Sequence, residues 1–133
     1  EIAKIHSSIA MTDISGFGLA CHLSDICISS GLSAIINLNN KVLIDTNFET
    51  LKTYKSTGFE NNFKASSSHV QCDSNNPFLN ILYDPQTNGP MLMVINQNQK
   101  NSFEKMYIDL NHSRPILLGN FKAKEEKLIT IMN

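Results

Sequence analysis

The residues best suited to chemistry lie in one run near the start of the chain, Met11–Leu23, which reads M-T-D-I-S-G-F-G-L-A-C-H-L. It places Asp13 and two glycines, Gly16 and Gly18, just ahead of a segment with helical spacing. Glycine tolerates a positive φ or a close neighbouring backbone, and the first amides of a helix carry positive partial charge. Such a turn suits a phosphate, and a carboxylate beside a phosphate suits Mg²⁺. The run therefore predicts a site where Asp13 holds a metal against a phosphate.

A structural interpretation of the same run is also open. Aspartate and serine ahead of a helix commonly cap its N-terminus, and turns with glycine are frequent. Asp13 and Ser15 would then serve only as caps. Local chemistry by itself favours this cap interpretation over the metal site.

The spacing of apolar residues predicts the elements around this run. Ile9–Asp13 reads as a short strand, Thr12–Gly18 as a strand-to-helix turn and Gly18–Ser30 as a helix that ends at Gly31. The apolar stripe of that helix comprises Leu19, Leu23, Ile26 and Cys27. Upstream, Glu1–Ser8 has the spacing of the tail of a helix that began earlier, so we expect an N-terminal domain before this chain.

Further strands and helices alternate along the rest of the sequence. We expect Phe59–Asp73, which is polar, to form a loop with a short strand around Phe63–Val70. The expected strands are Leu32–Leu38, Met91–Ile95 as a central strand, Ile116–Lys122 and Leu128–Met132. The expected helices are a capped one from Thr46 to Gly58, a short one from Asn76–Pro77 through Leu82 that ends by Asp84, and one over Asn98–Leu110 that ends at Asn111.

This alternation predicts an α+β or α/β fold with a mixed sheet, in a single domain over residues 1–133. The apolar fraction of 41% and the net charge of −1 indicate an ordinary globular protein without the basic excess of a nucleic-acid binder. No apolar run reaches the length of a membrane span, and residues 1–10 do not resemble a signal peptide. With three cysteines and no C-x-x-C pair, we expect reduced thiols and a cytoplasmic protein.

Two runs in the same order and at a similar distance carry a resemblance to a known family. Residues 10–23 resemble the T-D-x-T-G-F-G-L-x-G-H-L signature of selenophosphate synthetases. Asp84–Pro90, D-P-Q-T-N-G-P, is similar to their D-P-Q-T-S-G-G run. The resemblance covers nearly the whole chain. It implies the C-terminal domain type of the aminoimidazole ribonucleotide synthetase superfamily, a mixed sheet with packed helices that is partly ferredoxin-like.

The resemblance also implies a function. The family converts ATP, selenide and water into selenophosphate, AMP and phosphate. By residue match Asp13 binds Mg²⁺, whereas Thr12, Gly16, Asp84, Gln86 and Thr87 lie in the runs that contribute to ATP binding. The catalytic residues and the remaining carboxylates belong to an N-terminal ATP-binding domain, through which the family also forms homodimers. This chain alone is therefore expected to hold neither ATP nor Mg²⁺ tightly and to lack dikinase activity.

Three departures from the family pattern leave alternatives open. Cys21 replaces a glycine, Pro90 replaces the last glycine of the second run, and the family's V-P-G-G-T-x-x-N loop retains only Gly58 and Asn62. One alternative is another ATP-dependent superfamily member, related to hydrogenase-maturation proteins or thiamine-phosphate kinases, although the D-P-Q-T run argues against it. The other is a scaffold domain whose site has decayed.

Other candidate groups have simpler interpretations. His22 and Asp25, three apart on a helix, could form an oriented base, but a structural hydrogen bond is the commoner role. Cys21 lies next to His22, yet adjacent helical residues do not face each other, so a catalytic thiol is not favoured. The remaining histidines lack the spacing of zinc ligands. Asp84, Gln86 and Thr87 could equally build a turn.

Overall fold

The computed structural model describes residues 9–39, 42, 53 and 55–132. Residue contacts group into two compact units, Glu1–Asp13 with Pro90–Leu117, and Ile14–Gly89 with Leu118–Asn133. The predicted helix tail at Glu1–Ser8 and most of the predicted helix from Thr46 to Gly58 lie outside the described residues.

The larger unit contains a mixed four-stranded sheet in the order β3-β6-β2-β5. Strand β2 (Leu32–Asn37) pairs in parallel with β6 (Ile129–Met132) and antiparallel with β5 (Gly119–Ala123), while β3 (Val70–Gln71) pairs in parallel with β6. The prediction of a mixed sheet with helices, an α+β fold, is confirmed. Strands β5 and β6 both pair with β2, so the last two strands flank the first strand of this sheet.

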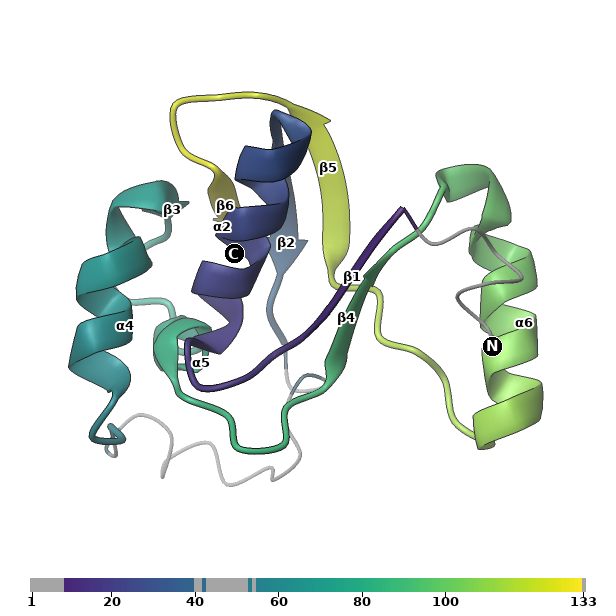
Figure 1. Ribbon diagram of the computed structural model, residues 1–133, viewed down its shortest axis with the longest axis horizontal. Coiled ribbons are helices and arrows are strands. Elements are labelled where there is room, and N and C mark those ends of the chain that lie inside the picture. Colours follow the sequence, from purple (N-terminus) through teal and green to yellow (C-terminus); the bar gives the residue numbers. More distant parts are fainter. Residues whose placement is uncertain (1–8, 40–41, 43–52, 54, 133) are drawn as a thin grey trace. The chain divides into compact units, whose positions relative to one another are not determined.

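Helix α2 (Gly18–Ser30) lies along this sheet and has the predicted bounds (Figure 1). It ends at Gly31, whose φ of 67° is left-handed and therefore favours glycine. Three of the four stripe residues are buried, and Ile26 is half-buried. The buried apolar side chains of α2 and of the two central strands are Leu19, Ala20, Leu23, Cys27, Ala34, Ile36, Ile129 and Ile131.

Helix α4 (Phe59–Ser66) occupies the segment for which the sequence predicts a loop, so that prediction is wrong. Its buried residues, Phe59, Asn62 and Ser66, recur at positions i, i+3 and i+7. Two of them are polar, so the apolar pattern that marks a helix is incomplete. Gly58, expected to end a helix, is instead the residue that precedes α4.

Helix α5 (Leu79–Tyr83) is short and begins later than predicted. Asn76 Oδ1 accepts the backbone N–H of Phe78 at 2.9 Å, which caps the turn that leads into the helix. The helix ends as predicted before Asp84, which is extended with a ψ of 124° because Pro85 follows it.

Tyr83 lies in an aromatic cluster between α4 and α5. Its ring meets Phe59 and Phe63 edge to face, with centroids 5.8 and 5.0 Å away. The Tyr83 side chain is fully buried. This burial, with a smaller contribution from Cys72, raises the pKa of its phenol to about 12.

We expect the free energy of unfolding to fall as pH rises from 10 to 12. An unfolded tyrosine loses its proton near pH 10, whereas Tyr83 keeps it to about pH 12, so the unfolded state binds fewer protons in this window. The loss from this group is at most about 1.4 kcal/mol per pH unit. Urea unfolding between pH 8 and 11.5 should show a steeper decline for the wild type than for Tyr83→Phe. Parallel declines in the two proteins would contradict the assignment.

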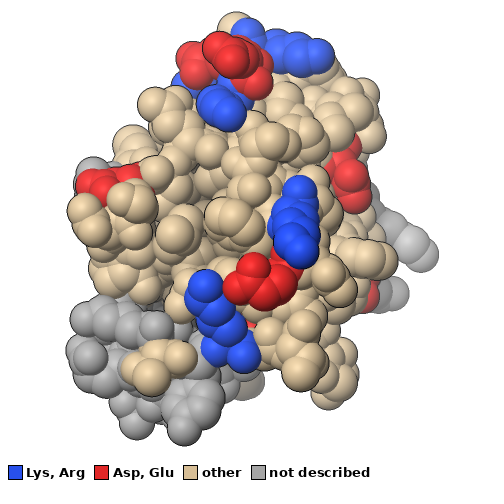
Figure 2. Space-filling view, turned by 90° about the vertical axis from the view of Figure 1, so that its left-hand side faces the viewer, with Lys and Arg blue, Asp and Glu red and all other residues tan. Residues whose placement is uncertain are grey.

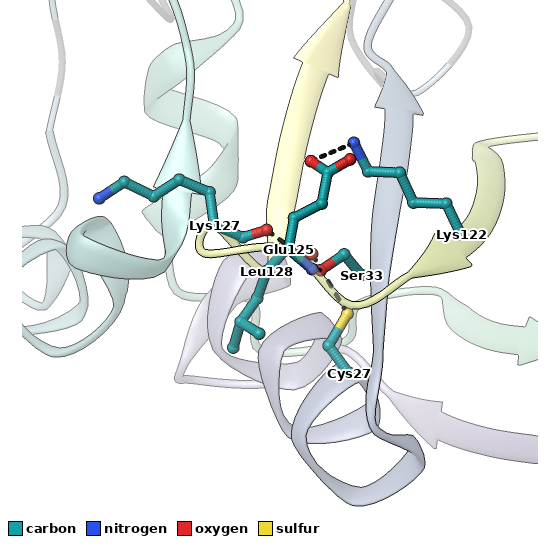
Figure 3. A network of polar contacts seen from close by, with 6 residues as sticks. All are labelled: Cys27, Ser33, Lys122, Glu125, Lys127 and Leu128. Atoms are coloured by element: carbon teal, nitrogen blue, oxygen red, sulfur yellow. Dashed lines mark hydrogen bonds and ion pairs between the residues drawn. The ribbon is translucent and has the colours of Figure 1, made fainter.

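The turn between β5 and β6 is fastened to the sheet by the buried Ser33 of β2 (Figure 3). Ser33 Oγ accepts the backbone N–H of Glu125 at 2.9 Å and donates to the carbonyl oxygen of Lys127 at 3.1 Å. One residue further, the carbonyl oxygen of Leu128 accepts the N–H of Ala34 at 2.7 Å and the thiol of Cys27 at 3.5 Å. The charged turn that joins the last two strands is thus where the sequence predicts it.

The smaller unit pairs β1 (Ala10–Asp13) with β4 (Met91–Val94) antiparallel and contains α6 (Lys100–Asn111), preceded by a turn of 3₁₀ helix, Gln97–Gln99. The strand at the start of the chain and the helix are confirmed. The prediction that the Met91 strand is central is wrong within the described residues, because β4 pairs there only with β1. A continuous apolar run does not distinguish a central strand from one side of a two-stranded ribbon.

The end of α6 differs from the prediction by one residue. His112, with a φ of 54°, takes the left-handed conformation expected of Asn111. Asn111 is the last residue of the helix, and its side-chain amide donates to the carbonyl oxygen of Tyr107 at 3.0 Å. A residue in the left-handed conformation ends the helix as predicted, one position later than expected.

Charges of both signs are mixed on the face that Figure 2 shows. Lys55 pairs with Glu60 at 3.6 Å, and Lys122 pairs with Glu125. Exposed pairs of this kind contribute little to stability. None of the helices in the described part of the chain is long and apolar enough to cross a membrane.

Candidate functional site

The turn that follows β1, Ile14–Phe17, leads directly into α2. Phe17 precedes the helix, and among the described residues no side chain caps it. Ser15 contacts the start of the helix only through its main chain: its carbonyl oxygen accepts the N–H of Gly18 at 3.0 Å. The cap interpretation of Asp13 and Ser15 is therefore wrong, since neither side chain supplies the oxygen that it requires.

Gly18 meets both conditions that single out glycine. Its φ is 75°, and a Cβ there would lie 3.0 Å from the carbonyl oxygen of Leu82 and 3.2 Å from that of Asp84. The start of α2 thus touches the end of α5 backbone to backbone. Gly16 meets neither condition, because its φ is not positive and no heavy atom of the described residues lies within 4 Å of an added Cβ. The conformational argument for Gly16 is wrong, and it holds for Gly18.

The second motif loop, Asp84–Gly89, lies against the first. The backbone N–H of Gln86 donates to the carbonyl oxygen of Ser15 at 3.2 Å. The Cα of Gly89 lies so close to Ile14 that an added Cβ would overlap the carbonyl oxygen of Ile14. Two runs about seventy positions apart in sequence therefore form one structure.

Asn62 of α4, a third segment, links the first loop to Tyr83, the residue that precedes the second loop. Its side-chain amide donates to the carbonyl oxygen of Gly16 and to that of Tyr83, both at 2.9 Å. Asn62 is 6% exposed; its bond to Tyr83 is buried, and its bond to Gly16 is partly buried. The sequence offers Asn62 only as a remnant of a family motif. A search for helical spacing that counts polar as well as apolar residues would include Phe59, Asn62 and Ser66, and could have placed Asn62 on the buried face of a helix.

His22 completes the set of contacts around the first loop. Its Nε2 accepts the backbone N–H of Ser15 at 3.2 Å and lies 3.0 Å from Ser15 Oγ. Because Nε2 accepts a backbone proton, the proton of the neutral ring lies on Nδ1. The expected structural hydrogen bond is confirmed, but among the described residues its partner is Ser15 and not Asp25.

Within the second loop, the side chains of Asp84 and Gln86 are hydrogen-bonded to each other. Gln86 Nε2 donates to Asp84 Oδ2 at 2.9 Å, and both side chains are half-buried. Thr87 is exposed. This geometry fits the turn-building role of Asp84 and Gln86. Their contribution to ATP binding stays a prediction.

Asp13 is exposed at the end of β1. Thr12 beside it is half-buried, and its hydroxyl donates to the carbonyl oxygen of Asp13 at 3.1 Å. Asp13 is thus accessible from solvent. In the part of the chain that is described, no three His, Cys, Asp or Glu side chains come together as a metal site.

The cysteines are free thiols. Cys27 is fully buried on the apolar stripe, and burial raises the pKa of its thiol, which makes it a poor nucleophile. Cys21 is half-buried. The packing role predicted for Cys27 is confirmed.

The comparison with protein families decides the affiliation. Residues 2–107 match the model of the AIR synthase related protein, C-terminal domain. The chain belongs to this family. The match includes the two motif loops and α4, and it ends before β5 and β6.

Relatives of this AIR synthase related domain carry a more specific name. The chain is similar to proteins named selenide, water dikinase from Shewanella sp. (strain ANA-3), at 28% identity over 124 residues, and Shewanella sp. (strain W3-18-1), at 30% over 123 residues. A third, from Sulfurovum sp. (strain NBC37-1), is 32% identical over 108 residues. These alignments cover 92%, 92% and 80% of this chain and 35%, 34% and 31% of the relatives.

The resemblance to selenophosphate synthetases drawn from the two motifs is confirmed at the level of the family and of these names. The chain spans about a third of the length of the relatives that it matches.

Proposed function

We propose that this chain is the C-terminal part of a selenide, water dikinase, which forms selenophosphate, AMP and phosphate from ATP, selenide and water. The names of its relatives support this assignment. The observation that carries it is the contact between the two motif loops, made by the N–H of Gln86 and the carbonyl oxygen of Ser15 at 3.2 Å. A turn used only to connect two elements does not require a second motif loop packed against it.

Asp13 is the residue of this chain that we assign to Mg²⁺. Asp13 is exposed and directly precedes Ile14, which lies against Gly89. When bound, Mg²⁺ would neutralise phosphate charge and orient the phosphorus that is attacked. One carboxylate fits a shared site and does not make a complete one, because Mg²⁺ in proteins takes one or two carboxylates together with phosphate oxygens. The other ligands would come from an upstream ATP-binding domain.

The loops themselves contribute positioning. The carbonyl oxygens of Ser15 and Gly16 are taken by Gly18, Gln86 and Asn62, and the amide of Ser15 is taken by His22. With these main-chain groups satisfied inside the protein, the turn is held in one arrangement before any ligand arrives. Such preorganisation lowers the entropic cost of binding.

The test is to compare this chain alone with the complete protein that carries it. We expect selenide-dependent release of AMP only from the complete protein, and no micromolar affinity for Mg²⁺–ATP in calorimetry of the chain alone. Micromolar binding by the chain alone would refute the shared site. A complete protein that hydrolyses ATP without regard to selenide would assign it to another activity of the superfamily. A complete protein that binds no nucleotide would make the domain a scaffold.

A further inference from the structure

Three segments far apart in sequence meet through one buried side chain. Asn62 lies 46 positions from Gly16 and 21 from Tyr83, and the Nδ2 atom of Asn62 lies 2.9 Å from the carbonyl oxygens of both. Gly16 belongs to the first motif loop. Tyr83 directly precedes the second, Asp84–Gly89. A single amide group therefore links the first loop to the residue from which the second loop starts.

The chemistry of this contact requires a double donor. Two carbonyl oxygens converge on one nitrogen, and the oxygen of Tyr83, whose bond is buried, needs a hydrogen most. A neutral amide nitrogen supplies two hydrogens at once, whereas a hydroxyl supplies one and a carboxylate none. Asparagine is also short enough to be fixed by its helix, since only two side-chain torsions have to be ordered.

We infer that Asn62 is a positioning residue that holds the two motif loops in register for ligand binding. It need not touch the ligand, because it acts through the main chain of Gly16 and of Tyr83. The kinetic part of this inference rests on the proposed function; the structural part does not.

The variant that tests it is Asn62→Leu, which keeps the side-chain size and removes both donors. Ser66→Ala is the matched control. Ser66 is buried on the same helix, and its hydroxyl bonds within that helix, to the carbonyl oxygen of Asn62 at 2.8 Å. Ser66→Ala removes one hydrogen bond within α4 and none to either loop.

Amide hydrogen exchange in the complete protein gives the first readout. In Asn62→Leu we expect exchange at residues 15–18 and 84–89 to rise about tenfold, the factor that corresponds to about one net hydrogen bond. Strand β6 should change no more than in Ser66→Ala. Unchanged loops, or an equal rise in the loops and β6, would overturn the inference.

Asn62→Ser serves if the leucine variant does not fold. Its hydroxyl has one hydrogen and can satisfy only one carbonyl oxygen, so at least one of the two loops should lose protection. Wild-type protection of both loops in Asn62→Ser would overturn the inference as well.

The second readout is kinetic. Asn62→Leu should raise the KM for Mg²⁺–ATP up to about tenfold, because apparent affinity falls with the fraction of molecules whose loops are in place. Ser66→Ala should leave this KM unchanged, and an equal rise in both variants would refute a positioning role. If the wild-type protein shows no selenide-dependent AMP release, the proposed function fails, and the exchange result still decides whether Asn62 couples the loops.

Discussion

Replacing Gly89 by alanine is expected to destabilise the protein by about 3 kcal/mol, the upper part of the usual range for forcing extra atoms into a packed site. An added Cβ would overlap the carbonyl oxygen of Ile14 and lie 3.0 Å from the Cβ of Gln86. The first obstacle is backbone and cannot rotate away, so the two motif loops have to separate. Urea unfolding of wild type and variant measures the loss.

Gly16→Ala is the control for this experiment. Gly16 lies in the first of the two loops, its φ is not positive, and the described residues leave the space of a Cβ open. We expect a change within about 0.5 kcal/mol, as for surface substitutions away from special features. If Gly89→Ala proves as mild as Gly16→Ala, the close approach of the loops is refuted.

Asp13→Asn is expected to lower the selenide-dependent activity of the complete enzyme by about 100-fold or more, since changes even to residues behind metal ligands cost 10- to 100-fold. The amide keeps the shape of the carboxylate and removes the charge that draws Mg²⁺. Asp13 is exposed, so the fold should tolerate the change. Initial rates of AMP release, measured over a range of Mg²⁺ concentrations, test this expectation.

Asp25→Asn provides the comparison, because Asp25 is an exposed carboxylate on α2 outside the proposed site. It should retain wild-type rates at every Mg²⁺ concentration. Equal rates for Asp13→Asn and wild type would remove Asp13 from the metal site and leave only its place at the end of β1.

Several local elements were predictable from apolar spacing, although β5 begins at Gly119, three residues after the start of the predicted strand Ile116–Lys122. Helix α2 has the predicted bounds, Gly18–Ser30, because an apolar stripe marks its face and Gly31 marks its end. Strand β1 at the start of the chain and β6 at its end were also found within a residue of their predicted starts. Helix α4 was missed because two of its buried residues, Asn62 and Ser66, are polar. Spacing read from apolar residues alone cannot detect a helix held by buried hydrogen bonds.

The candidate site shows the same division. The motif runs predicted that position 18 requires glycine. The structure explains this requirement, because the backbone of Leu82 and Asp84 leaves no room for a Cβ there. The same reasoning was wrong for Gly16, whose importance lies in its carbonyl oxygen. Nothing in the local sequence distinguishes the two glycines, since the difference depends on what lies opposite each.

The sequence by itself determined the family, the order of most elements and the two runs that form the loops, because these depend on short spacings and on residue types. Only the tertiary structure decided that the loops touch, that His22 binds Ser15 and not Asp25, and that Asn62 joins segments 46 and 21 positions away. Contacts at such separations depend on how helices and strands pack. A hydrogen bond between them leaves no periodic trace in the order of residues.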